Sequence, residues 1–406
     1  MIVMRSHNVP ALRLEGFDGE WEAQRAREIF IETDDRGYPD LPVLSATQTR
    51  GMVPRSMMDY IIQHNRANEV GYKRVCVGDF VVHLRSFQGG FAHSYYEGIT
   101  SPAYHVFRAR ESSRLDHKFW RFVFASSHFI HQLHFVTFGI RDGKSISFPE
   151  FLELPLNYAP TLEEQQAIGA IFTNLDAVIN QHTKKHQALQ QAKTALMQRM
   201  FPQAGQTVPE LRLDGFDGEW EYTTVDTVAN VVGGGTPSTS NPSFWDGDID
   251  WYSPNEVGSD IVAKPSNRRI TSEGLHASSA PLLPAHRTIL YTSRASIGNT
   301  AILEHPATTN QGFQSLVLRS GMDTYFVYFL TPLITRKAIK IASGSTFLEI
   351  SAKALGSIEI PIPPTLEEQQ AIGAVFTRLD TLIATEAKYI ESLKQTKTAL
   401  LQRMFI

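Results

Sequence analysis

The sequence predicts an α+β protein with a pseudo-two-fold internal repeat: two α/β domains separated by two long antiparallel helices that form a coiled coil. The first observation behind this prediction is a helical segment, residues 161–201, that recurs at 365–405. The second is a shorter motif, residues 12–22, that recurs at 211–221 with a single change. The third is that the blocks between these copies are not alike in letters. This alternation indicates one scaffold, used twice, that carries two different surfaces.

Length, charge and cysteine content limit the class of protein. A chain of 406 residues can form two or three domains with sizeable cores. The net charge of −4 means that basic groups for nucleic acid must be local, or must come from other subunits. The single cysteine, Cys76, excludes an internal disulfide framework and suits a reducing cytoplasm. No apolar run approaches the roughly 18 residues of a membrane span, so we expect a cytoplasmic protein without a membrane partner.

Each copy of the long segment begins with the pattern of a capping box, Thr161 with Glu164 and Thr365 with Glu368. In a capping box the threonine side chain accepts a free amide of the first turn, and the glutamate reaches back to the amide of the cap residue. The pattern therefore predicts helices that begin after Thr161 and Thr365.

The two helices share a seam of positions spaced four and three residues apart, which is typical of coiled-coil pairing. Each helix would be about 60 Å long, whereas a globule of 150 residues is only about 40 Å across. Antiparallel pairing is favoured, because a parallel second helix would need the chain to return a full helix length. The alternative is two unrelated amphipathic surface helices, but both copies keep the same spacing. The seam of the first copy is Ile168, Phe172, Leu175, Ile179, His182, His186, Leu189, Lys193, Leu196 and Met200.

Polar residues interrupt the seam near its middle, at His182, His186 and Glu386. Polar seam residues usually fix the register of a coiled coil, and a metal or catalytic role is the less favoured alternative. We hypothesise that Glu386 lies near His182. By the logic of the repeat, residues 10–21 should lie beside the end of the second helix, as residues 209–220 follow the first.

The unlike blocks contain short β-branched and aromatic runs separated by Gly, Pro, Asn and Ser, which predicts many short strands. The order of these runs is similar, so we expect the same α+β fold in both blocks. Segments 116–133 and 323–341 are expected to be helical. The predicted domains are a first α/β domain with an N-terminal arm, a helical spacer, a second α/β domain and a second spacer. Their bounds are 1–157, 158–203, 204–361 and 362–406.

Catalytic motifs are mostly missing from the sequence. The glycines at 233–235 lack the Gly-Lys-Ser/Thr of a phosphate loop, so a turn is favoured. The sequence from Asn241 to Phe244 is only superficially like a methyltransferase motif, and Asp116-His-Lys118 lacks a suitably spaced acidic partner. The histidines between His83 and His134 show no zinc-ligand spacing with cysteines. The sequence therefore predicts a protein that recognises a ligand and has no catalytic, cofactor or metal site of its own.

The order of the blocks resembles the specificity subunit of type I restriction–modification systems, and the resemblance covers essentially the whole chain. Each unlike block is followed by a helix that begins Pro-Thr-Leu-Glu-Glu-Gln-Gln. Several motifs together, in this order, are more specific than any one of them. The supporting motifs are Gly235-Thr-Pro-Ser238, Phe244-Trp245, Ile249-Asp-Trp-Tyr-Ser253, Arg294-Ala-Ser-Ile-Gly298, Asn310-Gln311 and Gly344-Ser345.

The resemblance implies a non-catalytic, sequence-specific DNA-binding subunit with two target-recognition domains. Each domain would read one half of a bipartite site in double-stranded DNA, separated by a spacer that is measured but not read. Two modification (methyltransferase) subunits and the restriction (endonuclease and translocase) subunits would be partners. S-adenosylmethionine, ATP and Mg are expected on those partners, and no cofactor is expected on this chain.

Reading base edges requires side chains such as Arg, Lys, Asn, Gln, Ser and Thr, whereas phosphate contacts only position the protein. Asn310 and Gln311 are the strongest candidates, because amide side chains can read adenine. A stand-alone DNA enzyme and a coiled-coil adaptor that binds proteins remain the alternatives. The DNA-binding candidates are Ser45, Thr47, Gln48, Arg85, Ser86, Ser101, Tyr104, Arg141, Lys144, Ser253, Asn255, Ser293, Arg294, Asn310, Gln311, Ser343 and Ser345.

Overall fold

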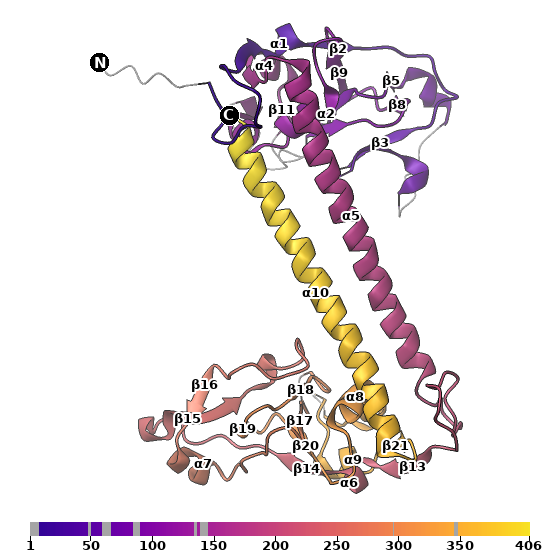
Figure 1. Cartoon of the computed structure of the whole chain (residues 1–406), viewed down its shortest axis with the longest axis vertical. Coiled ribbons are helices and arrows are strands. Elements are labelled where there is room, and N and C mark those ends of the chain that lie inside the picture. The colour runs from indigo at the N-terminus through magenta and orange to yellow at the C-terminus, as the bar shows by residue number, and fades with distance from the viewer. Residues whose placement is uncertain are drawn as a thin grey trace. The chain divides into compact units, whose positions relative to one another are not determined.

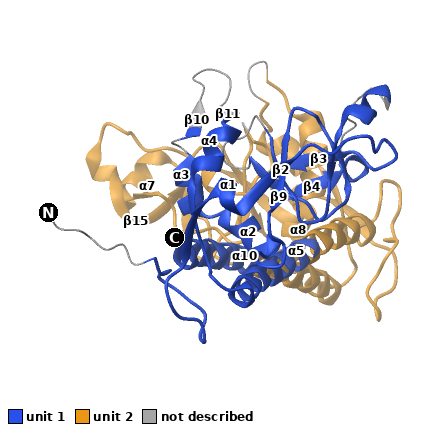
Figure 2. Cartoon of the chain, turned by 90° about the horizontal axis from the view of Figure 1, so that it is seen from above, with its two compact units in different colours: residues 1–184, 387–406 blue, residues 185–386 orange. Residues whose placement is uncertain are grey.

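The chain forms two compact units, coloured separately in Figure 2. The first unit comprises residues 1–184 and 387–406, and the second comprises residues 185–386. Within the part of the chain that is described, no helix is long and apolar enough to cross a membrane. The computed structural model describes residues 8–47, 50–58, 66–83, 90–133, 136–138, 145–294, 296–344 and 348–406.

The two recurring segments are long helices, α5 (Leu162–Arg199) and α10 (Leu366–Met404), as the sequence predicts (Figure 1). Each unit contains part of both helices, and inside each unit the two parts pair. In the first unit, the Phe172 ring lies 5.7 Å from the Phe405 ring, and Asp176 pairs with Lys397. Since the residue number rises along α5 while it falls along α10, this pairing is antiparallel.

The second unit pairs the same helices in the same sense. Lys185 lies 2.8 Å from Glu386, and Lys193 lies 2.6 Å from Asp380. The predicted antiparallel arrangement is therefore confirmed inside each unit. The prediction of four segments stays a prediction, because the compact units divide the chain differently.

A four-stranded antiparallel sheet forms the centre of each unit, with equivalent strand orders β2-β9-β6-β7 and β14-β20-β17-β18. The shared order confirms that one α+β fold occurs twice, although the letters of the two blocks differ. The strands of the first sheet are β2 (Phe30–Thr33), β6 (Phe80–Val82), β7 (Phe91–His93) and β9 (His105–Ala109). Those of the second are β14 (Ala229–Gly233), β17 (Thr288–Tyr291), β18 (Thr300–Ile302) and β20 (Gln314–Leu318).

A short antiparallel strand pair connects each block to its long helix, and two short helices cover the adjoining core. The first unit uses β1 (Glu22–Arg25), α1 (Ala26–Ile29), α4 (Phe148–Glu153) and β12 (Pro155–Tyr158). The second uses β13 (Glu221–Thr224), α6 (Val225–Val228), α9 (Ala352–Gly356) and β21 (Glu359–Ile362). Each main core includes apolar residues of both α5 and α10, so the helices are built into the units.

The units differ in the strands outside the shared sheet. The first unit has the antiparallel pairs β3 (Leu44–Thr47) with β4 (Gly51–Pro54), β5 (Lys73–Val75) with β8 (Gly98–Thr100), and β10 (Thr137–Phe138) with β11 (Ser145–Ile146). The second has a three-stranded sheet of β15 (Trp245–Tyr252), β16 (Arg268–Ile270) and β19 (Ala307–Thr309), with α7 (Ser272–Ser278). Short 3₁₀ turns are η1 (Arg55–Met57), η2 (Arg66–Gly71), η4 (Pro242–Phe244) and η5 (Pro254–Glu256).

One of the two predicted helices in the blocks is confirmed and the other is interrupted. Helix α8 (Thr324–Ile341) matches the predicted segment, and the Asp323 side chain caps it. The segment predicted as one helix over 116–133 is instead two, α2 (His117–Val123) and α3 (Ser127–Leu133). The buried Ser126 hydroxyl accepts the Phe129 amide at 3.2 Å, so it begins a new helix where the prediction continued the old one.

The capping-box prediction is right for the threonines and wrong for the glutamates. The Thr161 and Thr365 hydroxyls accept the amides of Glu164 and Glu368, at 3.3 and 3.2 Å. Neither carboxylate bonds back to the cap amide. Glu164 instead accepts two hydrogen bonds from Arg13, because a carboxylate with 1% exposure requires a charged partner.

The recurring short motif lies beside the helix ends in both units. The Leu12 amide donates to the Arg403 carbonyl at 2.8 Å, and the Leu211 amide donates to the Arg199 carbonyl at 2.9 Å. This confirms the prediction that residues 10–21 adjoin the end of α10.

The polar residues of the seam have distinct partners. The His182 ring packs edge-on against the Tyr389 ring, with centroids 4.6 Å apart, and Glu386 pairs with Lys185. The hypothesis that Glu386 couples to His182 stays a prediction.

Candidate nucleic-acid interface

In the second unit, several candidate residues follow the ends of two parallel strands, β15 and β19. Tyr252 pairs with Thr309 in the parallel register, and Ser253 and Asn310 are the next residues. The Asn310 amide donates to the Tyr252 carbonyl at 2.9 Å, which holds the two loops together. The parallel strands β15 and β19 thus bring residues that are distant in sequence to one edge of the sheet, which we call the candidate edge.

The first of these loops is held by its own side chains. The Ser253 hydroxyl donates to Glu256 Oε2, and the Ser253 amide donates to the same carboxylate at 2.8 Å. Asn255 is exposed, and its Oδ1 lies at hydrogen-bond distance from the Ser253 hydroxyl. Ser253 therefore shapes the loop, and Asn255 is the group that a ligand could reach.

The second loop presents two amide side chains whose carbonyl oxygens are already engaged. Asn310 Oδ1 accepts the Gly312 amide at 2.8 Å, and Gln311 Oε1 accepts the Thr236 hydroxyl. Gln311 is exposed, and Asn310 is half-buried. Within the described part of the chain, the NH₂ group of each amide, with two donors, makes no hydrogen bond and is open to an external acceptor.

The glycine-rich loop forms a turn close to this edge. The Gly235 amide donates to the Thr309 carbonyl at 2.8 Å, and a Cβ on Gly234 would lie 2.2 Å from the Asn310 carbonyl oxygen. Only glycine can approach so closely. Thr236, which follows this turn and orients Gln311, was not among the predicted site residues, although the motif that contains it was recognised.

Three further candidates lie along the same edge, joined to it by backbone hydrogen bonds. The Ser293 amide donates to the Gly312 carbonyl at 2.8 Å, and the Ile350 amide donates to the Ser293 carbonyl at 2.9 Å. Arg294 and Ser343 each form a backbone bridge with Glu349. The structure thus brings together segments from across the second block.

These three residues differ in what they can offer a ligand. Ser293 is fully buried and its hydroxyl has no hydrogen-bond partner among the described residues, so it cannot touch a ligand unless its surroundings open. The Arg294 guanidinium, in a half-buried residue, makes no hydrogen bond or ion pair with the described part of the chain. Ser343 is exposed.

Two tryptophan side chains donate hydrogen bonds to backbone carbonyls of the glycine-rich loop. Trp251 Nε1 donates to the Gly235 carbonyl at 2.9 Å, and Trp245 Nε1 donates to the Ser238 carbonyl at 3.1 Å. The Arg268 guanidinium lies over the Trp245 ring, 3.5 Å from its centroid, in a cation–π contact. Composition gave no sign of this support, because it depends on the pairing of β15 with β16.

The first unit has an edge that is related to the candidate edge of the second unit but carries different side chains. Val43 forms a parallel bridge with Ile99, so that the candidates Ser45 and Ser101 follow the bridge much as Ser253 and Asn310 follow theirs. Ser45 Oγ accepts Arg55 Nε at 3.3 Å. The Ser101 hydroxyl accepts the Ala103 amide, which shapes a turn.

The hairpin of β3 and β4 contains the candidate Thr47 and also Arg50, a basic residue that was not among the predicted site residues. The Thr47 hydroxyl donates to the Gly51 carbonyl at 2.8 Å and accepts the Arg50 amide at 3.0 Å. Tyr104 is half-buried, with its carbonyl accepting Lys73 Nζ at 3.0 Å. The remaining candidates lie outside the described residues: Gln48, Arg85, Ser86, Arg141, Lys144 and Ser345.

The residues of the possible catalytic motifs have structural contacts. Asp116 caps α2 by accepting the Phe119 amide at 2.7 Å, and Asn241 caps η4. Among the described residues, no group of three His, Cys, Asp or Glu side chains could hold a metal ion. Asp116 and Asn241 thus serve as caps in the described structure.

Comparison with known families agrees with this geometry. Residues 217–395 match the family described as "Type I restriction modification DNA specificity domain". The matched residues include the candidate edge of the second unit and most of α10.

Two relatives of this chain are specificity subunits of type I restriction enzymes. The chain is 35% identical over 192 residues to the MjaIX specificity subunit of Methanocaldococcus jannaschii, which covers 46% of the chain and 44% of the relative. It is 32% identical over 173 residues to the EcoR124I/EcoR124II specificity subunit of Escherichia coli, which covers 41% and 42%. The match thus spans under half the length of each of these two relatives.

Solved specificity subunits share the fold over nearly the whole chain. The type I restriction-modification S subunit from M. genitalium superposes with a TM-score of 0.60 at 14% identity, covering 98% of this chain and 99% of that one. The HsdS subunit from Thermoanaerobacter tengcongensis gives a TM-score of 0.50 at 18% identity, covering 95% and 96%. At these identities the likeness concerns the fold alone.

Proposed function

We propose that this chain is the DNA-recognition subunit of a type I restriction–modification complex, and that each unit reads one half of a bipartite target. The observation that carries the proposal is the repeated architecture. The same sheet order and the same helix anchors occur in both units, while the strands and loops outside the shared sheet differ. Unlike loops on a shared scaffold suit unlike half-sites.

The candidate edge of the second unit is chemically suited to this task. Gln311, Asn255 and Ser343 are exposed, and Arg294 is half-exposed and unpaired within the described part of the chain. Arginine and amide side chains are the usual readers of guanine and adenine edges, and each good bidentate pair contributes about 1–3 kcal/mol of discrimination. We propose Asn255, Arg294, Asn310, Gln311 and Ser343 as base or backbone contacts, with Ser253 and Ser293 in supporting positions.

Chemistry on the DNA would belong to partner subunits. Two modification subunits and the restriction subunits would join the chain, and would carry S-adenosylmethionine, ATP and Mg. The DNA-modifying step would be adenine methylation, and the chain itself would be non-catalytic and cytoplasmic. The predicted four-segment division would then assign one reader to each α/β segment and partner docking to the helical spacers.

Two assays test the proposal directly. The complex of the chain with its modification subunits should retard a cognate duplex in a mobility-shift assay, and the isolated chain should neither methylate nor cleave it. A complex that fails to bind any DNA would leave the second candidate, a coiled-coil adaptor for protein partners. Methyl transfer or cleavage by the purified chain alone would instead favour a stand-alone DNA enzyme.

A further inference from the structure

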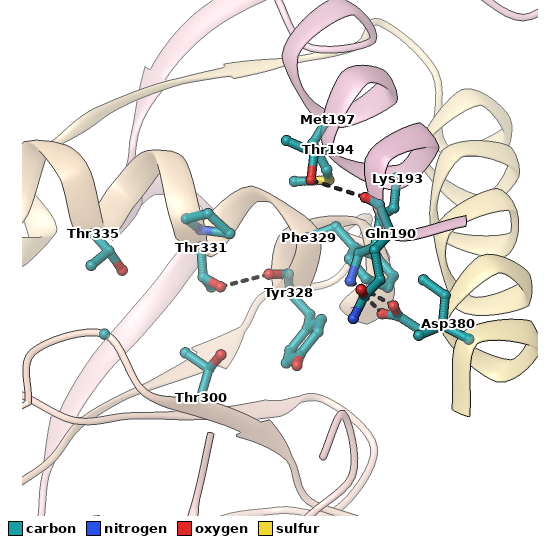
Figure 3. A pocket seen from close by; sticks show the side chains of 13 residues that line it. Gln190, Lys193, Thr194, Met197, Thr300, Tyr328, Phe329, Thr331, Thr335 and Asp380 are labelled. Carbon is teal, nitrogen blue, oxygen red and sulfur yellow. Dashed lines mark hydrogen bonds and ion pairs between the residues drawn. The ribbon is translucent and has the colours of Figure 1, made fainter. Parts of the chain in front are cut away.

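The two units contain equivalent cavities against their long helices, and the cavities differ in charge. In the first unit a cavity of about 670 Å³ is lined by residues of α2, α5 and α10 together with Arg50 and Tyr95. In the second unit a cavity of about 710 Å³ is lined by the corresponding stretches of α5, α8 and α10 (Figure 3). Both cavities contain the same recurring Lys–Asp pair.

The cavity of the second unit is close to neutral. Lys193 Nζ lies 2.6 Å from Asp380 Oδ1, and it also lies 5.4 Å from the centre of the Phe329 ring. Gln190 and Tyr328 also line this cavity (Figure 3). One ammonium group and one carboxylate are the charged groups of this lining.

The cavity of the first unit has more basic side chains, at positions equivalent to those that line the cavity of the second unit. Lys397 pairs with Asp176 and lies 5.6 Å from the Phe122 ring, as Lys193 does with Asp380 and Phe329. Arg121, which follows the Asp116 cap as Tyr328 follows the Asp323 cap, lies 2.9 Å from the same carboxylate. Lys394 occupies the place that Gln190 has in the other copy of the helix.

A fourth cation comes from outside the helices. Arg50 lies in the β3–β4 hairpin, and its side chain contacts the Met57 carbonyl at 3.5 Å and the Met58 sulfur at 3.7 Å. Within the described part of the chain, neither Arg50 nor Lys394 has a carboxylate partner. Four basic side chains thus face one carboxylate, which is already shared by Arg121 and Lys397. Such a concentration of like charge in a concave site attracts an anion.

The position of Arg50 indicates which anion binds in this cavity. The Arg50 amide donates to the Thr47 hydroxyl, so the cavity adjoins the hairpin that carries the DNA-reading candidates Ser45 and Thr47. We propose that Arg50, Arg121, Lys394 and Lys397 bind a backbone phosphate of the DNA beside the half-site read by the first unit. The second unit makes no equivalent contact. This inference rests on the proposed function and adds to it a sequence-independent anchor on one side only.

The natural difference between the two copies supplies a matched pair of variants. Lys394→Gln gives the first unit the residue of the second, and Gln190→Lys does the reverse; both sites are exposed. In the complex with the modification subunits, Lys394→Gln should weaken binding to cognate and random duplexes alike, by roughly threefold to tenfold. It should also reduce the slope of log K against log salt by about 0.9. Gln190→Lys should leave both quantities unchanged or raise affinity slightly.

Neutral methylphosphonate groups, placed one at a time along the duplex, locate the phosphate. One position beside the first half-site should weaken wild-type binding and have no additional effect on Lys394→Gln. Wild-type affinity and salt slope in Lys394→Gln would overturn the site. So would a variant that loses its modification subunits while the assembled fraction binds DNA normally, because the cavity would then hold an acidic protein segment. A wild-type complex that binds no duplex would overturn the proposed function and this site together.

Discussion

Arg212 holds the carboxylate of Glu368 with two hydrogen bonds, Nε to Oε1 at 2.9 Å and Nη2 to Oε2 at 2.8 Å. The carboxylate has 1% exposure, and Trp220 Nε1 approaches it at 3.3 Å. Arg13, Glu164 and Trp21 repeat this arrangement in the first unit. The contact fastens the recurring short motif to the first turn of a long helix in both units.

Loss of this buried charge should destabilise the second unit. Glu368→Gln leaves the Arg212 guanidinium buried without its counter-ion, which should lower the free energy of unfolding by about 3 kcal/mol. Urea unfolding measures the change. Glu367→Gln, at the exposed neighbouring position, should alter it by less than about 0.5 kcal/mol. Equal effects of the two substitutions would show that the buried pair is not an anchor.

A recurring glycine allows each long helix to approach the cap of a shorter one. A Cβ on Gly373 would lie 2.8 Å from Asp323 Oδ1 and 3.1 Å from the Phe326 amide nitrogen. Although alanine is the better helix former, Gly373→Ala should lower the free energy of unfolding by about 1–3 kcal/mol, because the cap must move. The control is Gly71→Ala, where no atom lies within 4 Å of the new Cβ. A stabilised Gly373→Ala protein would contradict the close approach.

The first unit should lose stability in acid through His93. Burial, with a smaller contribution from the charge of His117, lowers the pKa of His93 to about 3. His93 Nε2 lies 2.8 Å from His117 Nδ1. Between pH 6.5 and 3 the unfolded chain therefore binds one more proton, so stability falls as pH falls, by about 1.4 kcal/mol per unit.

Urea unfolding of wild type and His93→Gln at pH 6.5, 5.5 and 4.5 measures this dependence. The variant should be less stable at neutral pH and should show a shallower decline on acidification. His117, whose pKa burial also lowers, remains in both proteins. Parallel declines in the two proteins would exclude His93 as the source.

Arg294 should contribute to specificity. Because its guanidinium has no partner in the described part of the chain and lies on the candidate edge, it is available to a base. Arg294→Ala should weaken binding to the cognate duplex by about 1–3 kcal/mol more than binding to random DNA. Titration of both duplexes at one salt concentration measures the difference. If both affinities fell equally, Arg294 would be a phosphate contact.

The sequence was sufficient to predict the scaffold, because its signals are local and duplicated. The cap at Thr365 and the spacing from Ile372 to Met404 each depend on residues a few positions apart. The partner of Glu368 could not be found in this way. Arg212 lies 156 residues earlier, and only the folded chain places it against the helix start.

The candidate site was less predictable, because burial decides which polar side chains a ligand can touch. Ser293 lies in a recognised stretch yet is fully buried. Thr236, which lies beside Gln311, and Arg50, which lies in the β3–β4 hairpin, were missed. Residue type alone does not determine such exposure. Strand pairing, as between β15 and β19, determines it.

Selection from a random DNA pool tests the central claim most directly. The complex should enrich two short motifs separated by a spacer of fixed length and variable sequence. Selection with Gln311→Ala should weaken the base preference at one or more positions of one motif. The other motif and the spacer length should stay unchanged, because Gln311 belongs to the second unit alone. A single continuous motif, or a Gln311→Ala effect on both motifs, would contradict the account of two independent readers on one repeated scaffold.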